Sequence, residues 1–514
     1  MKRRDFLKNS FIAGASSMML PSFLSANSAL EFDDYKGILV LFLNGGNDGV
    51  NTFIPVKDGN DEYGYSAYFK SRESIAVRGD DLSDKLKKYI DGDNLQLEGW
   101  GNNIYNKTDS YRDNYTKAGF YIHDKGYNGD LNFNKNIATH ALMPEMAHYV
   151  NQGKVAIIQN VGNLFEPTTK KGIVDSTATL PPFLMAHDHQ TTVTFTGNSA
   201  TLSDFGLFGK LYDNWLGVND QNIYGMNMAL TNWNPKLLYG KKTSPIILSQ
   251  DGIQRFNSIN WNNTIFHKMM EYKREGEFKK LYNKLRKHSF AVVEKIEKDW
   301  RDYNSIYQGL KDSYGHDINF ERRSDDNELS FPHANIGAWD KVLLSAAKLM
   351  KIGKDSGLKR QVVYISLSFS GFDTHSDQKR THAILLRRLS SSLDKFQRVI
   401  KATGLEDEVT TVATSEFGRS VGSNGDGSDH AWGNHLFVLG GAVKGGLYGK
   451  APSMKLGSDD DMNNKGRLIP TTSMASYYNT VFKWFGVSES IRLKILPQLV
   501  NFDPKDRDIG FMKS

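Results

Sequence analysis

The 514-residue sequence contains no cysteine. This absence excludes disulfides, thiolate metal sites, cysteine nucleophiles and the acylated cysteine of a lipoprotein. Long apolar runs are also missing, because no run after the N-terminal segment reaches the roughly 18 apolar residues that a membrane-spanning helix needs. The sequence therefore predicts no transmembrane span.

The chain also lacks a strong excess of charge of either sign. Lys and Arg number 64, Asp and Glu number 58, and the formal net charge is +6. Residues 1–29 contain four Lys or Arg and one Asp, so this segment carries +3 and the remainder of the chain about +3. This balance does not indicate a nucleic-acid-binding surface, and we predict no nucleic-acid partner.

The first residues have the features of an export signal. The stretch "MKRRDFLKNSFIAGASSMMLPSFLSANSAL" combines a basic start, a modest apolar segment and small residues near Ala26 and Ala29. The pair Arg3–Arg4, followed by Asp-Phe-Leu-Lys, is typical of a twin-arginine signal. We therefore predict a signal peptide over 1–29, the twin-arginine export machinery as a partner, and a periplasmic or secreted location.

Continuous apolar runs, without alternation, predict buried parallel strands. Four such runs lie at 37–43, 154–161, 361–368 and 409–414, and a fifth run at 435–443 follows a polar loop. Amphipathic helices are predicted at 141–153 and 382–404. The alternation of helix and strand predicts an α/β fold with a mostly parallel sheet. We expect a single domain over 30–514, with a loop-rich insertion at about 57–135 and a helical one at about 215–335.

Ionisable side chains follow the predicted strands, where the ends of parallel strands meet at one edge of the sheet. The carboxylates and imidazoles among them suit a divalent metal such as Zn, Mn, Mg or Ca. The predicted metal ligands are Asp48, Asp373, His375, Glu416, Asp429, His430 and His435. Two alternatives stay open: Asp48 caps the element that follows it, and Asp373 and His375 only orient their loop.

Three further residues are predicted to act in catalysis. Arg419 could complement a phosphate or sulfate. His187 and His189 would point to one side if their segment were extended, although a structural hydrogen-bonded pair explains them equally well. Thr191 is a possible nucleophile because it lies close to these two histidines in the sequence.

With these motifs in hand, the sequence resembles the exported family called domain of unknown function 1501. The resemblance rests on "LVLFLNGGNDGVNT", "FLMAHDHQ", "GFDTHSDQ" and "TSEFGRSVGSNGDGSDHAWGNH", in this order. The family resembles a distant branch of the alkaline phosphatase and sulfatase superfamily. That resemblance implies an α/β/α sandwich with a metal site at the strand ends. The chain departs from the superfamily at Asn44, where an aspartate usually ends the first strand, and at Glu416-Phe417, where Asp-His is common.

Two functions remain open from the sequence. The first is a metal-dependent hydrolase of phosphate or sulfate esters, acting on a small anionic ester or a polysaccharide. The alternative is a non-catalytic exported protein that retains the fold and serves surface polysaccharide or adhesion assembly. The departures at Asn44 and Glu416 favour the alternative.

Overall fold

The structure is a computed structural model that describes residues 32–57, 61–79, 119–124, 133–219, 222–231, 233–250, 252, 292–313, 315–318, 336–367 and 371–514. The predicted signal peptide lies outside these residues, as do most of the predicted insertion at 57–135 and much of the one at 215–335. Within the described ranges, no helix combines the length and apolar character needed to cross a membrane.

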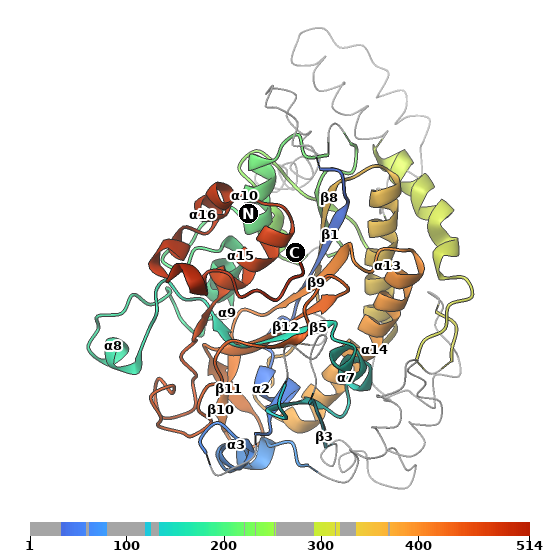
Figure 1. Ribbon diagram of the computed structural model, residues 1–514. Coiled ribbons are helices and arrows are strands. Elements are labelled where there is room, and N and C mark those ends of the chain that lie inside the picture. The colour runs from blue at the N-terminus through green and yellow to red at the C-terminus, as the bar shows by residue number, and fades with distance from the viewer. Residues whose placement is uncertain are drawn as a thin grey trace, which may run out of the picture.

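A mixed sheet of nine strands forms the centre of the molecule (Figure 1). Its strands are β1 (Lys36–Phe42), β5 (Val155–Gly162), β6 (Asn227–Ala229), β7 (Ile246–Ile247), β8 (Arg360–Ser366), β9 (Val409–Thr414), β12 (Asn434–Gly440), β13 (Gly446–Tyr448) and β14 (Thr472–Ser473). The order is β13-β5-β12-β9-β1-β8-β6-β7, and β14 pairs with β5. β1 is parallel to both β8 and β9, whereas β12 is antiparallel to its neighbours β9 and β5.

The four runs predicted as parallel strands are β1, β5, β8 and β9, so this prediction is confirmed. β5 and β9 share a direction because both are antiparallel to β12. The fifth run forms β12, which runs the other way. The segment between β9 and β12 folds as a small hairpin instead of the helical crossover that a parallel return usually requires.

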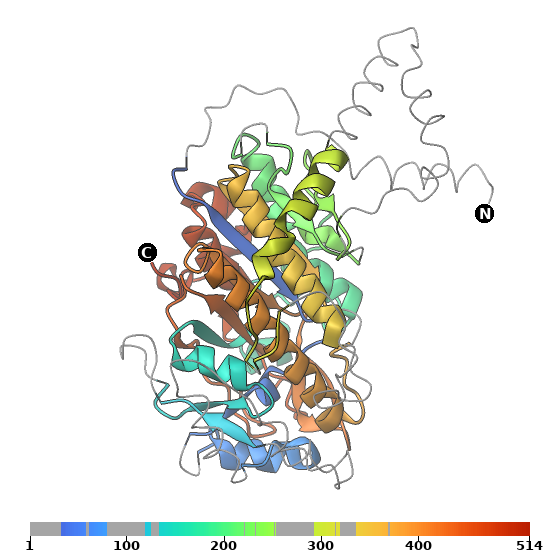
Figure 2. The ribbon, with the colours of Figure 1, turned by 90° about the vertical axis from the view of Figure 1, so that its right-hand side faces the viewer.

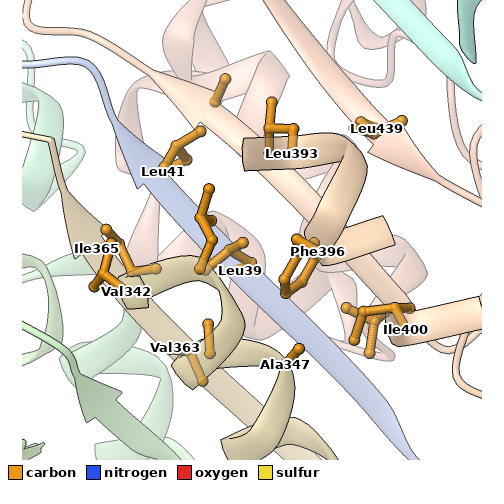
Figure 3. Packing of buried hydrophobic residues seen from close by; sticks show 14 of the residues in the cluster. Leu39, Leu41, Val342, Ala347, Val363, Ile365, Leu393, Phe396, Ile400 and Leu439 are labelled. Atoms are coloured by element: carbon orange, nitrogen blue, oxygen red, sulfur yellow. The ribbon is translucent and has the colours of Figure 1, made fainter. Parts of the chain in front are cut away.

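One face of the sheet packs against three helices, α7 (Pro144–Asn151), α13 (Ile336–Asp355) and α14 (Gln378–Ala402). Alternate residues of β1 supply this face, and Figure 3 shows Leu39 beside Phe396 of α14 and Leu41 near Leu393 of the same helix. Figure 2 shows α13 and α14 lying along the sheet. The helices predicted at 141–153 and 382–404 are α7 and α14, and both are confirmed.

The opposite face packs against α9 (His187–Thr196), α10 (Leu207–Asn214), α15 (Met474–Trp484) and α16 (Glu489–Ile495) (Figure 1). The remaining residues of β1, Ile38, Val40 and Phe42, belong to this second core. Because β1 is apolar on both faces, its run has no alternation. Helices on both faces of a mostly parallel sheet confirm the predicted α/β/α sandwich.

Two small sheets extend the carboxyl edge of the main sheet. One is the hairpin β10 (Gly418–Ser423) and β11 (Ser428–Ala431), and the other has the order β2-β4-β3, formed by Phe53–Pro55, Ile137–His140 and Phe120–Ile122. The helices α2 (Gly49–Thr52), α3 (Tyr65–Arg72) and α8 (Lys170–Val174) lie in the neighbouring connections. The polar segment after β9, which we expected to be a loop, is therefore mostly a hairpin. Its polar side chains pair at the edge of the fold, where no continuous apolar run is needed.

Candidate metal centre

Three segments bring imidazoles and a carboxylate together at the carboxyl edge of the sheet. Asp373 and His375 follow β8, His430 lies on β11, and His187 is the first residue of α9. Suitable ligand atoms of His187, Asp373 and His430 all lie within 4.8 Å of one another. His375 lies beside two members of this group: its Nε2 is 2.9 Å from Nε2 of His430 and 3.1 Å from Oδ1 of Asp373.

The spacing of the ligand atoms of His187, Asp373 and His430 suits one metal ion. Nε2 of His430 lies 3.1 Å from Nε2 of His187 and 3.1 Å from Oδ1 of Asp373. Nε2 of His187 lies 3.6 Å from Oδ2 of Asp373. Tetrahedral ligands at roughly 2.0–2.1 Å from a zinc ion would lie about 3.3–3.4 Å from one another. The donor set therefore fits a single ion of this size.

The imidazole tautomers also favour a cation between the rings. Nδ1 of His430 lies 2.9 Å from the carbonyl oxygen of Met185, which can only accept a hydrogen bond, so Nδ1 carries a proton. Nδ1 of His187 lies 2.8 Å from Oε1 of Glu416, again an acceptor. When these imidazoles are neutral, their Nε2 lone pairs face each other. A bound cation converts that repulsion into coordination.

A carboxylate or carbonyl stands behind each imidazole. Glu416 is behind His187, the Met185 carbonyl is behind His430, and Oδ1 of Asp429 lies 3.6 Å from Nδ1 of His375. Such outer partners set the tautomer and orientation of metal-binding histidines. The structure thus places Glu416 and Asp429, which we predicted as ligands, one step behind the ligand atoms.

The charges around the group shift the pKa values of its members. The hydrogen bond to Glu416 raises the pKa of His187, whereas burial lowers the pKa of His430. Burial alone would raise the pKa of Asp373, but the hydrogen bond and charge of Arg419 outweigh it and lower that pKa to about 2. Asp373 is consequently ionised at neutral pH and available as a ligand.

Arg419 does not have the role that we predicted for it. Its buried guanidinium donates to the carbonyl oxygens of Gly45 (2.6 Å), Gly46 (2.9 Å), Phe372 (3.2 Å) and Ser428 (3.0 Å), and it pairs with Asp373. The side chain thereby joins the segments after β1 and β8 to the β10–β11 hairpin. With its donors directed at the protein, Arg419 positions the site, and binding of an anion by Arg419 is not supported.

The prediction of Asp48 as a metal ligand is also corrected. Asp48 is the N-cap of α2, and Oδ1 accepts a hydrogen bond from the backbone N–H of Asn51. Both carboxylate oxygens pair with Arg72, at 2.9 and 2.6 Å, and both side chains are fully buried. The open alternative, in which Asp48 caps the next element, agrees with the structure. Arg72 gave no signal in the sequence, because it lies in the segment expected to be a surface insertion.

Three other predicted residues lie apart from the ligand group. His435 is buried on β12, where its Nδ1 lies 3.3 Å from the backbone nitrogen of Asn160, and burial lowers its pKa to about 4. The expectation of an extended His187–His189 segment was wrong, because α9 begins at His187. Residues two apart on a helix point to different sides. His189 instead contacts Phe183, with ring centroids 4.2 Å apart. Thr191 is 2% exposed, which argues against a substrate reaching it.

The role of Met185 could not be predicted from the sequence. This residue adopts φ of 69°, which is uncommon outside glycine, and its carbonyl oxygen faces His430. Only the backbone of Met185 takes part, so its residue type carried no signal.

A family profile described as "Protein of unknown function (DUF1501)" matches residues 35–472, and no curated protein matches. Among solved structures, Ps i-CgsB in complex with k-i-k-neocarrahexaose is similar at 11% identity and a TM-score of 0.31, covering 70% of this chain and 72% of that chain. A phosphonate monoester hydrolase from Silicibacter pomeroyi is similar at 8% identity and a TM-score of 0.27, covering 67% and 68%. The phosphonate monoester hydrolase of Agrobacterium radiobacter has 13% identity and a TM-score of 0.24, covering 71% and 73%.

Proposed function

This chain belongs to the DUF1501 family, and we propose that it is an exported, metal-dependent hydrolase of phosphate or sulfate esters. The observation that supports the proposal is the convergence of His187, Asp373 and His430 at the carboxyl edge of the sheet, with His375 beside the last two. Edges of this kind are where α/β folds bind their ligands. The substrate class comes from the resemblance of the sequence to the alkaline phosphatase and sulfatase superfamily.

The exposure of the group favours an open, catalytic site over a closed, structural one. The side chains of Asp373 and His375 are 44% and 45% exposed, so solvent and substrate can approach from their side. Structural metal sites are closed by their protein ligands, whereas catalytic sites keep one position open. His187 and His430 lie further in and are held by Glu416 and the Met185 carbonyl.

The residues of the site would hold the metal and admit the ester. His187, Asp373 and His430 would be ligands, with His375 beside them. A divalent ion supplies charge neutralisation of the anionic ester and activation of water when it is bound. Water is the nucleophile in this proposal, because Thr191 is buried. Arg419 keeps Asp373 ionised and in place through their ion pair.

The non-catalytic alternative also has support. Asp48 and Arg419 are engaged within the protein, and Asn44 stands where the superfamily usually has an aspartate. With these residues engaged, the described site has ligands for one metal ion and no arginine that is available to bind an anionic substrate. A protein of this kind would retain the fold and serve surface polysaccharide or adhesion assembly.

Metal content and esterase activity of purified, unchelated protein test the two candidates. We expect stoichiometric divalent metal and hydrolysis of a chromogenic phosphate or sulfate ester, lost in Asp373→Ala and His430→Ala. His189→Ala is the matched control, since its ring lies against Phe183 and outside the ligand group. Stoichiometric metal without hydrolysis of any ester would favour the non-catalytic candidate, and a stable protein without metal would overturn the metal site itself.

A further inference from the structure

We propose that Glu416 is the positioning residue that makes His187 a ligand, in a site that selects one ion of the zinc type over magnesium or calcium. This inference rests on the proposed metal site and adds the class of ion and the residue that prepares the site for it. It is independent of whether the bound ion serves catalysis.

The contacts of Glu416 orient the imidazole of His187. Oε1 accepts hydrogen bonds from Nδ1 of His187 (2.8 Å) and from the backbone N–H of Gly45 (2.8 Å). Oε2 accepts a hydrogen bond from the hydroxyl of Ser415 at 3.2 Å. The carboxylate is thus fixed by the ends of β1 and β9, and it fixes His187 in turn. With Nδ1 occupied in this way, Nε2 of His187 faces His430 and Asp373 as a free donor.

Because Glu416 is buried, the stability of its carboxylate depends on the charge of His187. Its side chain is fully buried, and in the described part of the chain the basic group within ion-pair distance is His187. A buried carboxylate is costly unless a positive partner compensates it. A neutral imidazole compensates it only through one hydrogen bond, whereas a metal-bound imidazole also carries positive charge. The Glu416–His187 pair therefore favours a cation at Nε2.

The other outer carboxylate offers a natural comparison. Asp429 lies behind His375 at 3.6 Å, beyond normal hydrogen-bond distance, and its side chain is 41% exposed. Water and salt screen such a contact strongly. The two acidic residues thus occupy equivalent places behind two histidines, and the structure assigns the strong contact to Glu416 alone.

The donor set determines the class of ion. Two of the three converging ligand atoms are imidazole nitrogens and one is a carboxylate oxygen, and His375 adds another imidazole beside them. Imidazole suits zinc, copper, nickel and iron, whereas magnesium and calcium require mainly oxygen ligands, usually six or more. Of the four ions considered from the sequence, zinc therefore fits this group best, and magnesium and calcium fit it worst.

Metal titration of the full chain tests the inference without an activity assay. Zinc affinity is measured by competition with a chromogenic chelator, and cobalt(II) is added as a spectroscopic probe whose visible bands report its ligands. We expect Glu416→Gln to weaken zinc binding roughly 10–100-fold and to shift the cobalt bands, as loss of an outer partner does in other metal sites. Asp429→Asn should leave affinity and bands close to those of the wild type. Excess magnesium or calcium should not displace cobalt.

A double-mutant cycle separates positioning from a general structural effect. If Glu416 acts through His187, Glu416→Gln should change zinc affinity little in the His187→Ala background. If Glu416→Gln does not fold, Glu416→Asp replaces it, and the retracted carboxylate should still weaken zinc binding more than Asp429→Asn does.

The outcomes distinguish this inference from the proposed function. A wild-type protein that binds neither zinc nor cobalt would overturn the metal site and both proposals together. A wild type that binds zinc, but whose Glu416 and Asp429 variants have equal affinity, would overturn only the role of Glu416. Displacement of cobalt by magnesium or calcium would overturn the assignment of the ion.

Discussion

Replacing Arg419 by methionine should destabilise the protein strongly, whether or not metal is bound. The guanidinium is fully buried and satisfies four backbone carbonyl oxygens, of Gly45, Gly46, Phe372 and Ser428. Methionine has a similar length but no donor, so all four carbonyls would lose the guanidinium, although that of Phe372 would keep the backbone N–H of Thr374 at 2.9 Å. Each unsatisfied buried acceptor costs about 1–3 kcal/mol.

The four costs will not add in full. Water can enter beside the half-exposed Asp373 and satisfy some of the carbonyls, and the Asp373 ion pair itself contributes only about 0–1 kcal/mol because it is partly exposed. We therefore expect a loss of about 3–5 kcal/mol in the free energy of unfolding, which is less than the full sum for four unsatisfied buried acceptors. Arg419→Lys should recover part of the loss, since one ammonium cannot reach acceptors in three segments.

Urea unfolding in the presence of a chelator measures this loss. Arg380→Met is the matched control, because Arg380 pairs with Asp377 on the surface and should contribute about 0–1 kcal/mol. If the free energy of unfolding of Arg419→Met lies within 1 kcal/mol of that of the wild type, the contacts of the Arg419 guanidinium do not stabilise the fold. The guanidinium would then be available for an anion, as we had predicted from the sequence.

Three further predictions follow from the sequence and the site. Lysine at both Arg3 and Arg4 should abolish delivery to the periplasm in a fractionation assay while the protein still folds, and efficient delivery would exclude the twin-arginine signal. Burial alone would raise the pKa of Asp48, but the charge of its buried partner Arg72 outweighs this effect and lowers that pKa. The pair should therefore stabilise the fold fully above about pH 4, and this stabilisation should be lost at lower pH. Asp48→Asn should remove that part of the acid sensitivity and cost about 3–5 kcal/mol at neutral pH by denaturant unfolding, and an unchanged acid profile would contradict the pairing. Removal of metal by a chelator should lower the melting temperature, since zinc at 1,000 times its Kd adds about 4 kcal/mol to the folded state, and equal melting curves would show that no metal is bound.

Much of the fold could be predicted from the sequence because burial on both faces leaves a local pattern. The run at 37–43 is apolar throughout since Leu39 and Leu41 face one layer of helices and Ile38 and Val40 face the other. Parallel strands also end at the same edge, so Asp373 and Glu416, although far apart in the chain, were expected near each other. The segment after β9 was not recognised as a hairpin, because polar side chains at the edge of the fold need no apolar periodicity.

The tertiary structure decided what each polar residue of the site does. The sequence by itself determined the strands, their shared edge and the kinds of side chain that gather there. Whether a carboxylate binds a metal, supports an imidazole or pairs with an arginine depends on the single atom that reaches it from a distant segment. Glu416 contacts His187, Asp48 pairs with Arg72, and Arg419 donates to carbonyl oxygens of three segments. The local spacing of residues in the sequence does not predict these contacts. The sequence therefore showed which charged and metal-binding side chains gather at the site. The role of each one depends on the tertiary packing, which excludes water and determines which groups face each other.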